Sequence, residues 1–300
     1  MISFKEIQVF LGSSIEENKS IEEDVGWNEG QIYEKTGITS RSISSSEEDT
    51  EELALKSSQK LKSSTVGVNL IISVTNTPTK SFPGISNSIH SLLNLDDSCH
   101  CITLNAGCSG YVDALKIAYS EIHRNHSSKV LIITSDTYSK FISKDNRSIR
   151  PLFGDGSSCT LLQYEKGGFK LKKEDYISKK DSQDVLCMPG SEIFMDGPKV
   201  LLFGISNVIP QLKKVIDDLA LEEAILIPHQ AGKIMLERVK KSVNNKIKIL
   251  ENYAETGNLV STSIPNAIYQ SKTRLDDYKT LIFLGFGVGL ASSILVFTKQ

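Results

Sequence analysis

The sequence lacks both a large net charge and a long run of basic residues. Its 34 Lys and Arg residues nearly balance 36 Asp and Glu residues, giving a net charge of −2. A protein that binds nucleic acid through its phosphates needs a basic patch or stripe, so this function class is excluded. No uncharged apolar run approaches the roughly 18 residues that a membrane span requires. We therefore expect a protein without a membrane span and without a nucleic-acid partner.

Cysteine is also scarce, and its pattern excludes two common roles. The five cysteines are an odd number, and none shows the paired spacing of a metal site. Cys99 and Cys101 form only a C-x-C at the edge of an expected strand. The residues 1–5 do not begin an apolar core of the kind that signal peptides contain. We expect free thiols, no metal and a cytoplasmic protein.

Hydrophobic periodicity predicts strands that alternate with helices. Apolar runs of strand length recur along the chain, and helical patterns lie between them. This alternation predicts a layered α/β fold with a mostly parallel sheet. The order of strands and helices in the second half of the chain weakly resembles that in the first half. The expected strands are residues 2–11, 66–74, 101–104, 129–135, 158–164, 223–227, 247–250, 281–284 and 292–297.

Three further local features carry predictions. The serines of residues 44–46 and the acids that follow them are typical of a helix start, with the serines as caps. The lysine-rich and polar residues 165–185 are interpreted as a seam between two halves of the chain. Residues 195–220 are expected to be helical.

Cys108 is the first candidate functional residue. It lies between Gly107 and Gly110, where a short apolar strand gives way to a helical pattern. A helix N-terminus offers unpaired N–H groups and a partial positive charge, which favour the nucleophilic thiolate. One interpretation is a catalytic cysteine that carries an acyl group. The other is a buried structural cysteine, the commoner role of a free thiol.

His229 and Asn258 are the other two candidates, because both lie in loops at the ends of expected strands. A neutral imidazole near a thiol exchanges protons with it. A side-chain amide donates a hydrogen bond to a developing oxyanion. Each residue also has a structural alternative, since a lone histidine is often a core residue and an asparagine after a glycine is often a turn residue.

Six motifs in one order resemble the β-ketoacyl-acyl-carrier-protein synthases of type III, a family of thiolase-like enzymes. The resemblance runs along nearly the whole chain. It implies two duplicated α/β halves in five layers, αβαβα, with residues 1–164 carrying the nucleophile and residues 165–300 carrying the histidine and asparagine. The motifs are Lys35-Thr36-Gly37-Ile38, Phe82-Pro83, Ala106-Gly107-Cys108-Ser109-Gly110, Phe153-Gly154-Asp155-Gly156, Pro228-His229-Gln230-Ala231, and Gly257-Asn258 with Ser263-Ile264-Pro265, followed by the glycine-rich Phe286-Gly287-Val288-Gly289.

The resemblance also implies a reaction. An acyl thioester loads onto Cys108, and a malonyl thioester then loses CO2 with help from His229 and Asn258 and condenses with the acyl group. It implies no cofactor beyond the substrates acyl-CoA and malonyl-carrier protein or malonyl-CoA. The implied partners are an acyl carrier protein and a second copy of the chain, or a homologue in a heterodimer. The residues implied to contact substrate are Lys35, Phe82, Arg147, Phe153, Gly197, Gly287 and Val288.

Several positions depart from the family pattern. Gly232 stands where the family usually has Asn, and Gln31 stands where well-known members have a Trp that stacks on CoA. Val288 replaces a glycine of the oxyanion loop, and a β-branched residue resists positive φ. These departures keep two alternatives open. One is an acyltransferase that moves the acyl group from Cys108 to an alcohol or amine, and the other is a non-catalytic partner of an active homologue.

Overall fold

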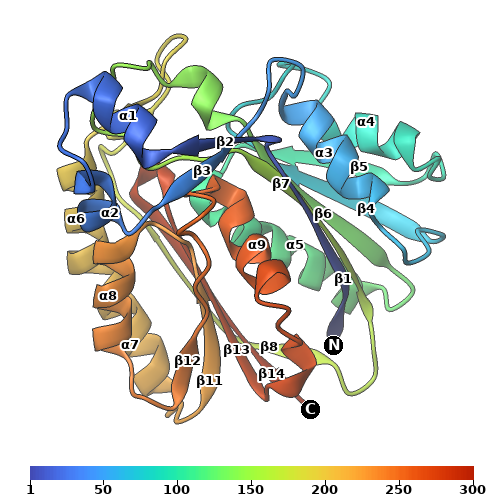
Figure 1. The fold of residues 1–300 in the computed structure, drawn as a ribbon. Helices are drawn as coiled ribbons and strands as arrows, with labels where there is room; N and C mark the ends of the chain where they lie inside the picture. Colours follow the sequence, from blue (N-terminus) through green and yellow to red (C-terminus); the bar gives the residue numbers. More distant parts are fainter.

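The computed structural model describes all 300 residues and consists of layered strands and helices (Figure 1). Two short ribbons stand apart from the main sheet: β2 (Ser14–Glu17) with β3 (Ser40–Ile43), and β9 (Leu186–Cys187) with β10 (Phe194–Met195). The strands of the main sheet are β1 (Ile2–Leu11), β4 (Val68–Val74), β5 (His100–Leu104), β6 (Lys129–Asp136), β7 (Gly156–Tyr164), β8 (Phe169–Ser178), β11 (Ala224–Pro228), β12 (Ile247–Ile249), β13 (Thr280–Gly287) and β14 (Ala291–Lys299).

The main sheet has ten strands in the order β12-β11-β13-β14-β8-β1-β7-β6-β4-β5. Its two halves meet at β8 and β1, which share the single pair Ile2 and Phe169. The helices are α1 (Asn18–Val25), α2 (Gln31–Thr36), α3 (Thr50–Gln59), α4 (Ile85–Leu92), α5 (Gly110–Arg124), α6 (Gly197–Phe203), α7 (Ile209–Asp218), α8 (Lys233–Ser242) and α9 (Ser263–Gln270).

Five layers follow from how the helices pack. Helices α5 and α9 lie between the two halves of the sheet, α3 and α4 cover one outer face, and α7 and α8 cover the other (Figure 1). The largest core cluster joins α5 and α9 to both halves of the sheet through residues such as Tyr111, Ile264 and Phe283. Because α5 is buried among apolar side chains, the turn that precedes it is held firmly in place.

The predicted α/β fold with duplicated halves is confirmed. The order β4-α4-β5-α5-β6-β7 is repeated as β11-α8-β12-α9-β13-β14, and α5 and α9 occupy the same central layer. The expectation of a mostly parallel sheet is wrong, because β1, β7, β8 and β14 pair antiparallel with their neighbours. Parallel pairing is confined to β5-β4-β6 and β12-β11-β13. Each half therefore has three parallel strands at the outer edge of the sheet and antiparallel strands towards the centre.

One local prediction is wrong, and one strand was not predicted. Helix α3 is capped by Asp49, whose carboxylate accepts the N–H of Glu52 at 2.8 Å, and not by the serines before it. A carboxylate is a strong cap for a helix N-terminus, and it lies at the position where the backbone turns into the helix. The polar residues 165–185 contain β8, in which partly buried and exposed residues alternate. Lys170 and Lys172 lie on the exposed side and Lys173 on the partly buried side, and lysines on both faces hid the strand pattern.

The proposed boundary after residue 164 falls between β7 and β8. The two halves share one hydrogen-bonded sheet, so their division into separate domains stays a prediction. The helical stretch over 195–220 is confirmed as α6 and α7, joined by a π-helical turn over Gly204–Val208. None of the helices combines the length and the apolar character needed to cross a bilayer.

Candidate active site

Cys108 lies in a single 3₁₀ turn, Gly107–Ser109, between β5 and α5. Gly107 has a φ of +54°, and a Cβ there would lie 2.6 Å from Cγ2 of Val288 and would also collide with Asn76. Only glycine fits both this backbone conformation and this close approach. The turn presents Cys108 with only 4% of its surface exposed.

Burial decides the protonation of the Cys108 thiol. Desolvation, with a smaller contribution from the nearby Asp136 carboxylate, raises the pKa of Cys108 to about 12. The backbone N–H groups of Val288 and of Cys108 itself act in the opposite direction. The expected thiolate is therefore wrong for the resting site, because loss of hydration outweighs the field of the helix. The same two N–H groups provide a pair of donors beside the sulfur.

His229 follows β11, and its backbone N–H donates to the Leu284 carbonyl of β13 at 2.7 Å. The ring is buried and packs edge-on against Phe286, with 5.4 Å between centroids. Burial lowers the pKa of His229 to about 3, with a smaller opposite contribution from the Val260 backbone. Nδ1 is buried without a hydrogen-bond partner. The imidazole is therefore neutral at physiological pH.

Asn258 is oriented by hydrogen bonds to its oxygen. Oδ1 accepts the N–H of Val260 at 2.9 Å and the hydroxyl of Ser263 at 3.4 Å. Both bonds occupy the oxygen and leave the NH2 group to face His229, whose Nε2 lies 3.3 Å from Nδ2. The Asn258 N–H donates to the Leu152 carbonyl at 2.8 Å, which ties this loop to the segment around Phe153.

These side chains meet in one cavity of about 150 Å³. Six of the ten predicted site residues line it, although they come from distant parts of the chain: Cys108, Phe153, Gly197, His229, Asn258 and Gly287. The cavity is mostly apolar, and an apolar site strengthens the interactions of the few polar groups inside it. The remaining lining residues are Leu152, Leu186, Met195, Val200, Leu201, Ala231, Met235 and Phe286.

The other four predicted residues lie outside this cavity. Lys35 is exposed on α2 and places its Nζ 4.4 Å from the ring centroid of Trp27. Arg147 is exposed, and Phe82 is 85% exposed on a loop. Val288 instead lines a second pocket of about 370 Å³, which shares Leu186 with the cavity. The substrate-binding roles of these residues stay predictions.

The glycine-rich loop accommodates Val288 without strain. The positive φ values of this loop fall on Gly287, Gly289 and Leu290, so Val288 itself keeps an ordinary backbone conformation. Gly287 lies so close to the nucleophile that a Cβ there would be 2.8 Å from Cβ of Cys108. Val288 thus supplies its N–H to the sulfur as a glycine would.

Several cavity residues are not apparent from the sequence. Phe286 and Ala231 belong to motifs that were recognised, so they could have been found there. Leu186, Met195 and Val200 lie in the segment between β8 and α7, which carries no motif. Apolar residues in such a segment give no sign of whether they face a core or a cavity.

The comparisons with known proteins agree with this geometry. Residues 102–179 match the sequence model of 3-oxoacyl-[acyl-carrier-protein (ACP)] synthase III, and residues 220–299 match the model of its C-terminal part. A β-ketoacyl-[acyl-carrier-protein] synthase III from Rickettsia canadensis is 29% identical over 300 residues, and one from Clostridium novyi is 29% identical over 309 residues. Each alignment covers 94% of both chains.

Solved structures match over almost the full length. A crystal structure of a 3-oxoacyl-(acyl-carrier-protein) synthase III superposes with a TM-score of 0.89, at 23% identity, and covers 99% of both chains. The corresponding protein from Aquifex aeolicus gives a TM-score of 0.87 at 22% identity, covering 99% of this chain and 100% of its own. These matches establish the thiolase-like fold predicted from the motifs.

Proposed function

Because this chain belongs to the 3-oxoacyl-[acyl-carrier-protein] synthase III family, we propose that it is a condensing enzyme that joins an acyl group to a malonyl thioester. The observation that carries the proposal is the meeting of Cys108, His229 and Asn258 in one apolar cavity. A thiol supplies the nucleophile, and the other two side chains supply nitrogen groups that exchange a proton or donate a hydrogen bond.

The first stage is acyl transfer to Cys108. The Asn258 NH2 donates to Nε2 of His229, so Nε2 holds the lone pair in the resting site. Nε2 accepts the thiol proton as Sγ attacks the thioester carbonyl. The N–H groups of Cys108 and Val288 stabilise the oxyanion. The carbon–sulfur bond to CoA then breaks, and the proton passes to the departing sulfur.

The second stage forms the new carbon–carbon bond. After CoA leaves, water carries the single imidazole proton of His229 from Nδ1 to Nε2, and the malonyl carbonyl oxygen accepts hydrogen bonds from Nδ2 of Asn258 and from this Nε2–H. Cleavage of the carboxylate releases CO2 and leaves an enolate held by these two donors. Its carbon attacks the acyl-cysteine carbonyl and the carbon–sulfur bond breaks. The Cys108 thiolate takes the Nε2 proton of His229 while Nδ1 takes one from water, which restores the resting tautomer. Thiol, imidazole and carboxamide supply this chemistry without a further cofactor.

The proposed carrier-protein partner follows from the names of the relatives. Those names specify an acyl carrier protein, so we assign malonyl-carrier protein as the acceptor. Acyl-CoA is proposed as the donor from the resemblance of the motifs. A homodimer and a cytoplasmic location are part of the same proposal. The family assignment favours condensation over acyl transfer to an alcohol or amine, and no feature of the cavity favours that alternative.

The test is a two-step assay. The protein is incubated with an acyl-CoA and its intact mass is measured, after which a malonyl-carrier protein with a labelled carboxylate is added. The proposal expects an acyl adduct on Cys108 followed by release of labelled CO2 and formation of a β-ketoacyl product. Cys108→Ala is the control and loses the adduct. An adduct that goes to an alcohol or amine without CO2 release contradicts the proposal.

A further inference from the structure

The second pocket is lined by residues that neighbour the proposed nucleophile. Leu186 lines both the pocket and the catalytic cavity. Val288 lines the pocket, and its backbone N–H faces the Cys108 sulfur. Asn76, a third wall residue, packs against Gly107, the residue before the nucleophile. An acyl group on Sγ whose oxygen meets the Val288 N–H therefore lies beside residues that line this pocket.

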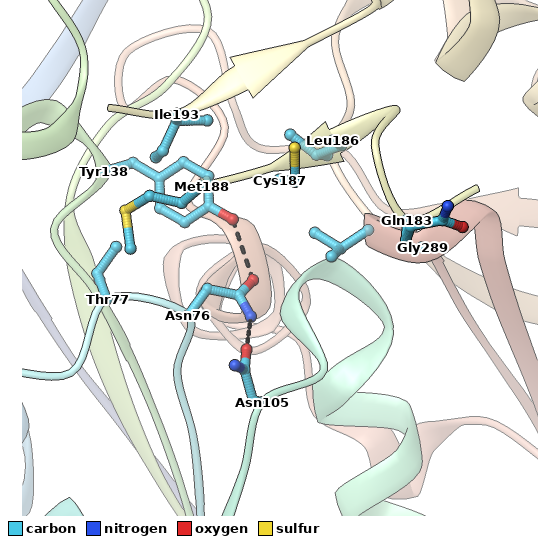
Figure 2. Close-up of a pocket in the computed structure, with 11 residues that line it drawn as sticks. Asn76, Thr77, Asn105, Tyr138, Gln183, Leu186, Cys187, Met188, Ile193 and Gly289 are labelled. Carbon is cyan, nitrogen blue, oxygen red and sulfur yellow. Dashed lines mark hydrogen bonds between the residues drawn. The ribbon is translucent and has the colours of Figure 1, made fainter. Parts of the chain in front are cut away.

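The size of the pocket suits an acyl chain. Its volume of about 370 Å³ exceeds the 150 Å³ of the cavity at the thiol. Ligand sites in proteins typically begin near 300 Å³. Leu186, Met188 and Ile193 form an apolar side on which methylene groups can pack (Figure 2).

Another part of the pocket wall is polar and ordered. Figure 2 shows Tyr138, Asn76 and Asn105 joined in a line by hydrogen bonds. The Tyr138 hydroxyl donates to Oδ1 of Asn76 at 3.0 Å, and Nδ2 of Asn76 donates to Oδ1 of Asn105. These two bonds use the Tyr138 proton and Oδ1 of Asn105. The lone pairs of the tyrosine oxygen and the N–H groups on Nδ2 of Asn105 remain available to a ligand. One end of the line can accept a hydrogen bond and the other can donate one.

The Tyr138 side chain is buried in this polar wall and packs against a neighbouring ring. Its side chain is 3% exposed, and its ring lies 4.9 Å from the ring of Phe153, which lines the catalytic cavity. A buried hydroxyl beside a binding site is costly to cover with a plain alkyl chain, because its unused hydrogen-bonding capacity is then lost. An apolar residue at this position would suit a saturated acyl group better.

We propose that the second pocket receives the acyl group carried by Cys108, and that Tyr138, Asn76 and Asn105 select acyl groups bearing a hydroxyl on the chain over plain saturated ones. This inference rests on the proposed function and specifies its substrate class. A hydroxyl both donates and accepts, so it can meet the free lone pairs of Tyr138 and the free N–H groups of Asn105.

The experiment compares three acyl-CoA donors of equal chain length: butanoyl-CoA, 3-hydroxybutanoyl-CoA and 4-hydroxybutanoyl-CoA. Intact-mass measurement gives the rate at which each loads the full-length protein before any malonyl thioester is added. At least one hydroxylated donor is expected to load roughly threefold to tenfold faster than butanoyl-CoA, the effect of one net hydrogen bond. Because Cys187 also lines the pocket, adducts that persist in Cys108→Ala are subtracted.

Two variants test whether the polar wall residues cause the preference for hydroxylated donors. Tyr138→Phe and Asn105→Ala are each expected to slow hydroxyacyl loading relative to butanoyl loading, so that the ratio of the two rates falls towards one. The matched control is Tyr111→Phe, which removes a hydroxyl that is equally buried but bonds to Thr160 in the core. That control is expected to keep the preference for the hydroxylated donor.

The outcomes separate the two proposals. If butanoyl-CoA loads as fast as both hydroxylated donors, the selectivity inference is overturned and the proposed function stands. If the preference survives in Tyr138→Phe and Asn105→Ala, these residues are not its source, and the inference is likewise overturned. If none of the donors forms an adduct on Cys108, the proposed function fails and the inference fails with it.

Discussion

Nδ2 of Asn258 lies 3.3 Å from Nε2 of His229, although the two residues are 29 positions apart and follow different strands. Two further bonds to Oδ1 of Asn258 fix which end of the amide faces the ring. The imidazole and the carboxamide therefore present neighbouring nitrogens to one point of the cavity. That arrangement suits a single oxygen that gains negative charge during a reaction.

Removing the carboxamide should slow the second stage of the proposed reaction and leave the first stage nearly unchanged. Asn258→Ala is expected to lower the rate of CO2 release from the malonyl thioester by about 10²–10³-fold, the usual effect of losing one oxyanion donor. Acyl loading of Cys108 should change little, since its oxyanion faces backbone N–H groups instead. Separate assays of loading and CO2 release measure the two effects. Asn252→Ala, on the same loop, is the control, and equal losses in both stages would contradict this assignment.

Gly287 should tolerate no side chain. In Gly287→Ala the new methyl group would lie 2.8 Å from Cβ and 3.0 Å from Sγ of Cys108, at a φ of +152°. We expect acyl loading to fall by about 10²-fold, because a shift of roughly 1 Å in a reacting group has that effect. Gly67→Ala is the control for backbone strain, since Gly67 also has positive φ but faces open space. Normal loading in Gly287→Ala would show that the loop moves freely.

The buried imidazole should make stability depend on pH. His229 in the folded protein stays neutral down to pH about 3, whereas in the unfolded chain its pKa is near 6.5. Below pH 6.5 the unfolded state binds the additional proton, so acidification from pH 6.5 towards 3 lowers the free energy of unfolding. The slope from this one residue reaches about 1.4 kcal/mol per pH unit.

Asp136 acts in the opposite direction and has to be separated from His229. Burial raises the pKa of Asp136 to about 6 from 3.8, so the folded state takes up that proton first as pH falls. The measurement is therefore the difference in urea unfolding free energy between the wild type and His229→Asn across pH 7 to 4. Loss of the exposed imidazole in His126→Asn serves as the control. A pH dependence that is identical in the wild type and His229→Asn would refute the prediction.

Asp155 should matter for folding more than for chemistry. Its carboxylate accepts the N–H of Ser44 at 2.8 Å, the N–H of Ser139 at 3.0 Å and both serine hydroxyls. Asp155→Ala leaves these buried donors unpaired and is expected to reduce the free energy of unfolding by about 2–4 kcal/mol. Urea titration measures this change. Asp217→Ala, which removes an exposed carboxylate, should leave stability nearly unchanged, and equal stability in Asp155→Ala would contradict the structural role.

Much of the fold could be predicted from local sequence patterns. The buried strands β4, β6 and β13 are apolar runs, and an apolar run of that length is the signature of a strand covered on both faces. The helix after Cys108 was visible from its apolar stripe at helical spacing. The strand β8 was missed because its lysines mask the alternation, and the antiparallel pairings were missed because strand direction depends on connections across the sheet rather than on the strand itself.

The sequence by itself determined which chemical groups the site has, because the order of its motifs places a thiol, an imidazole and a carboxamide in three loops. Only the tertiary structure decided that these groups share one cavity, that the thiol is neutral, and that Lys35 and Arg147 lie outside. It also decided that Tyr138 and Asn76 face a pocket beside the nucleophile. The reason is physical: desolvation and contact between distant segments depend on what packs around a residue, and no local pattern of residues records that packing.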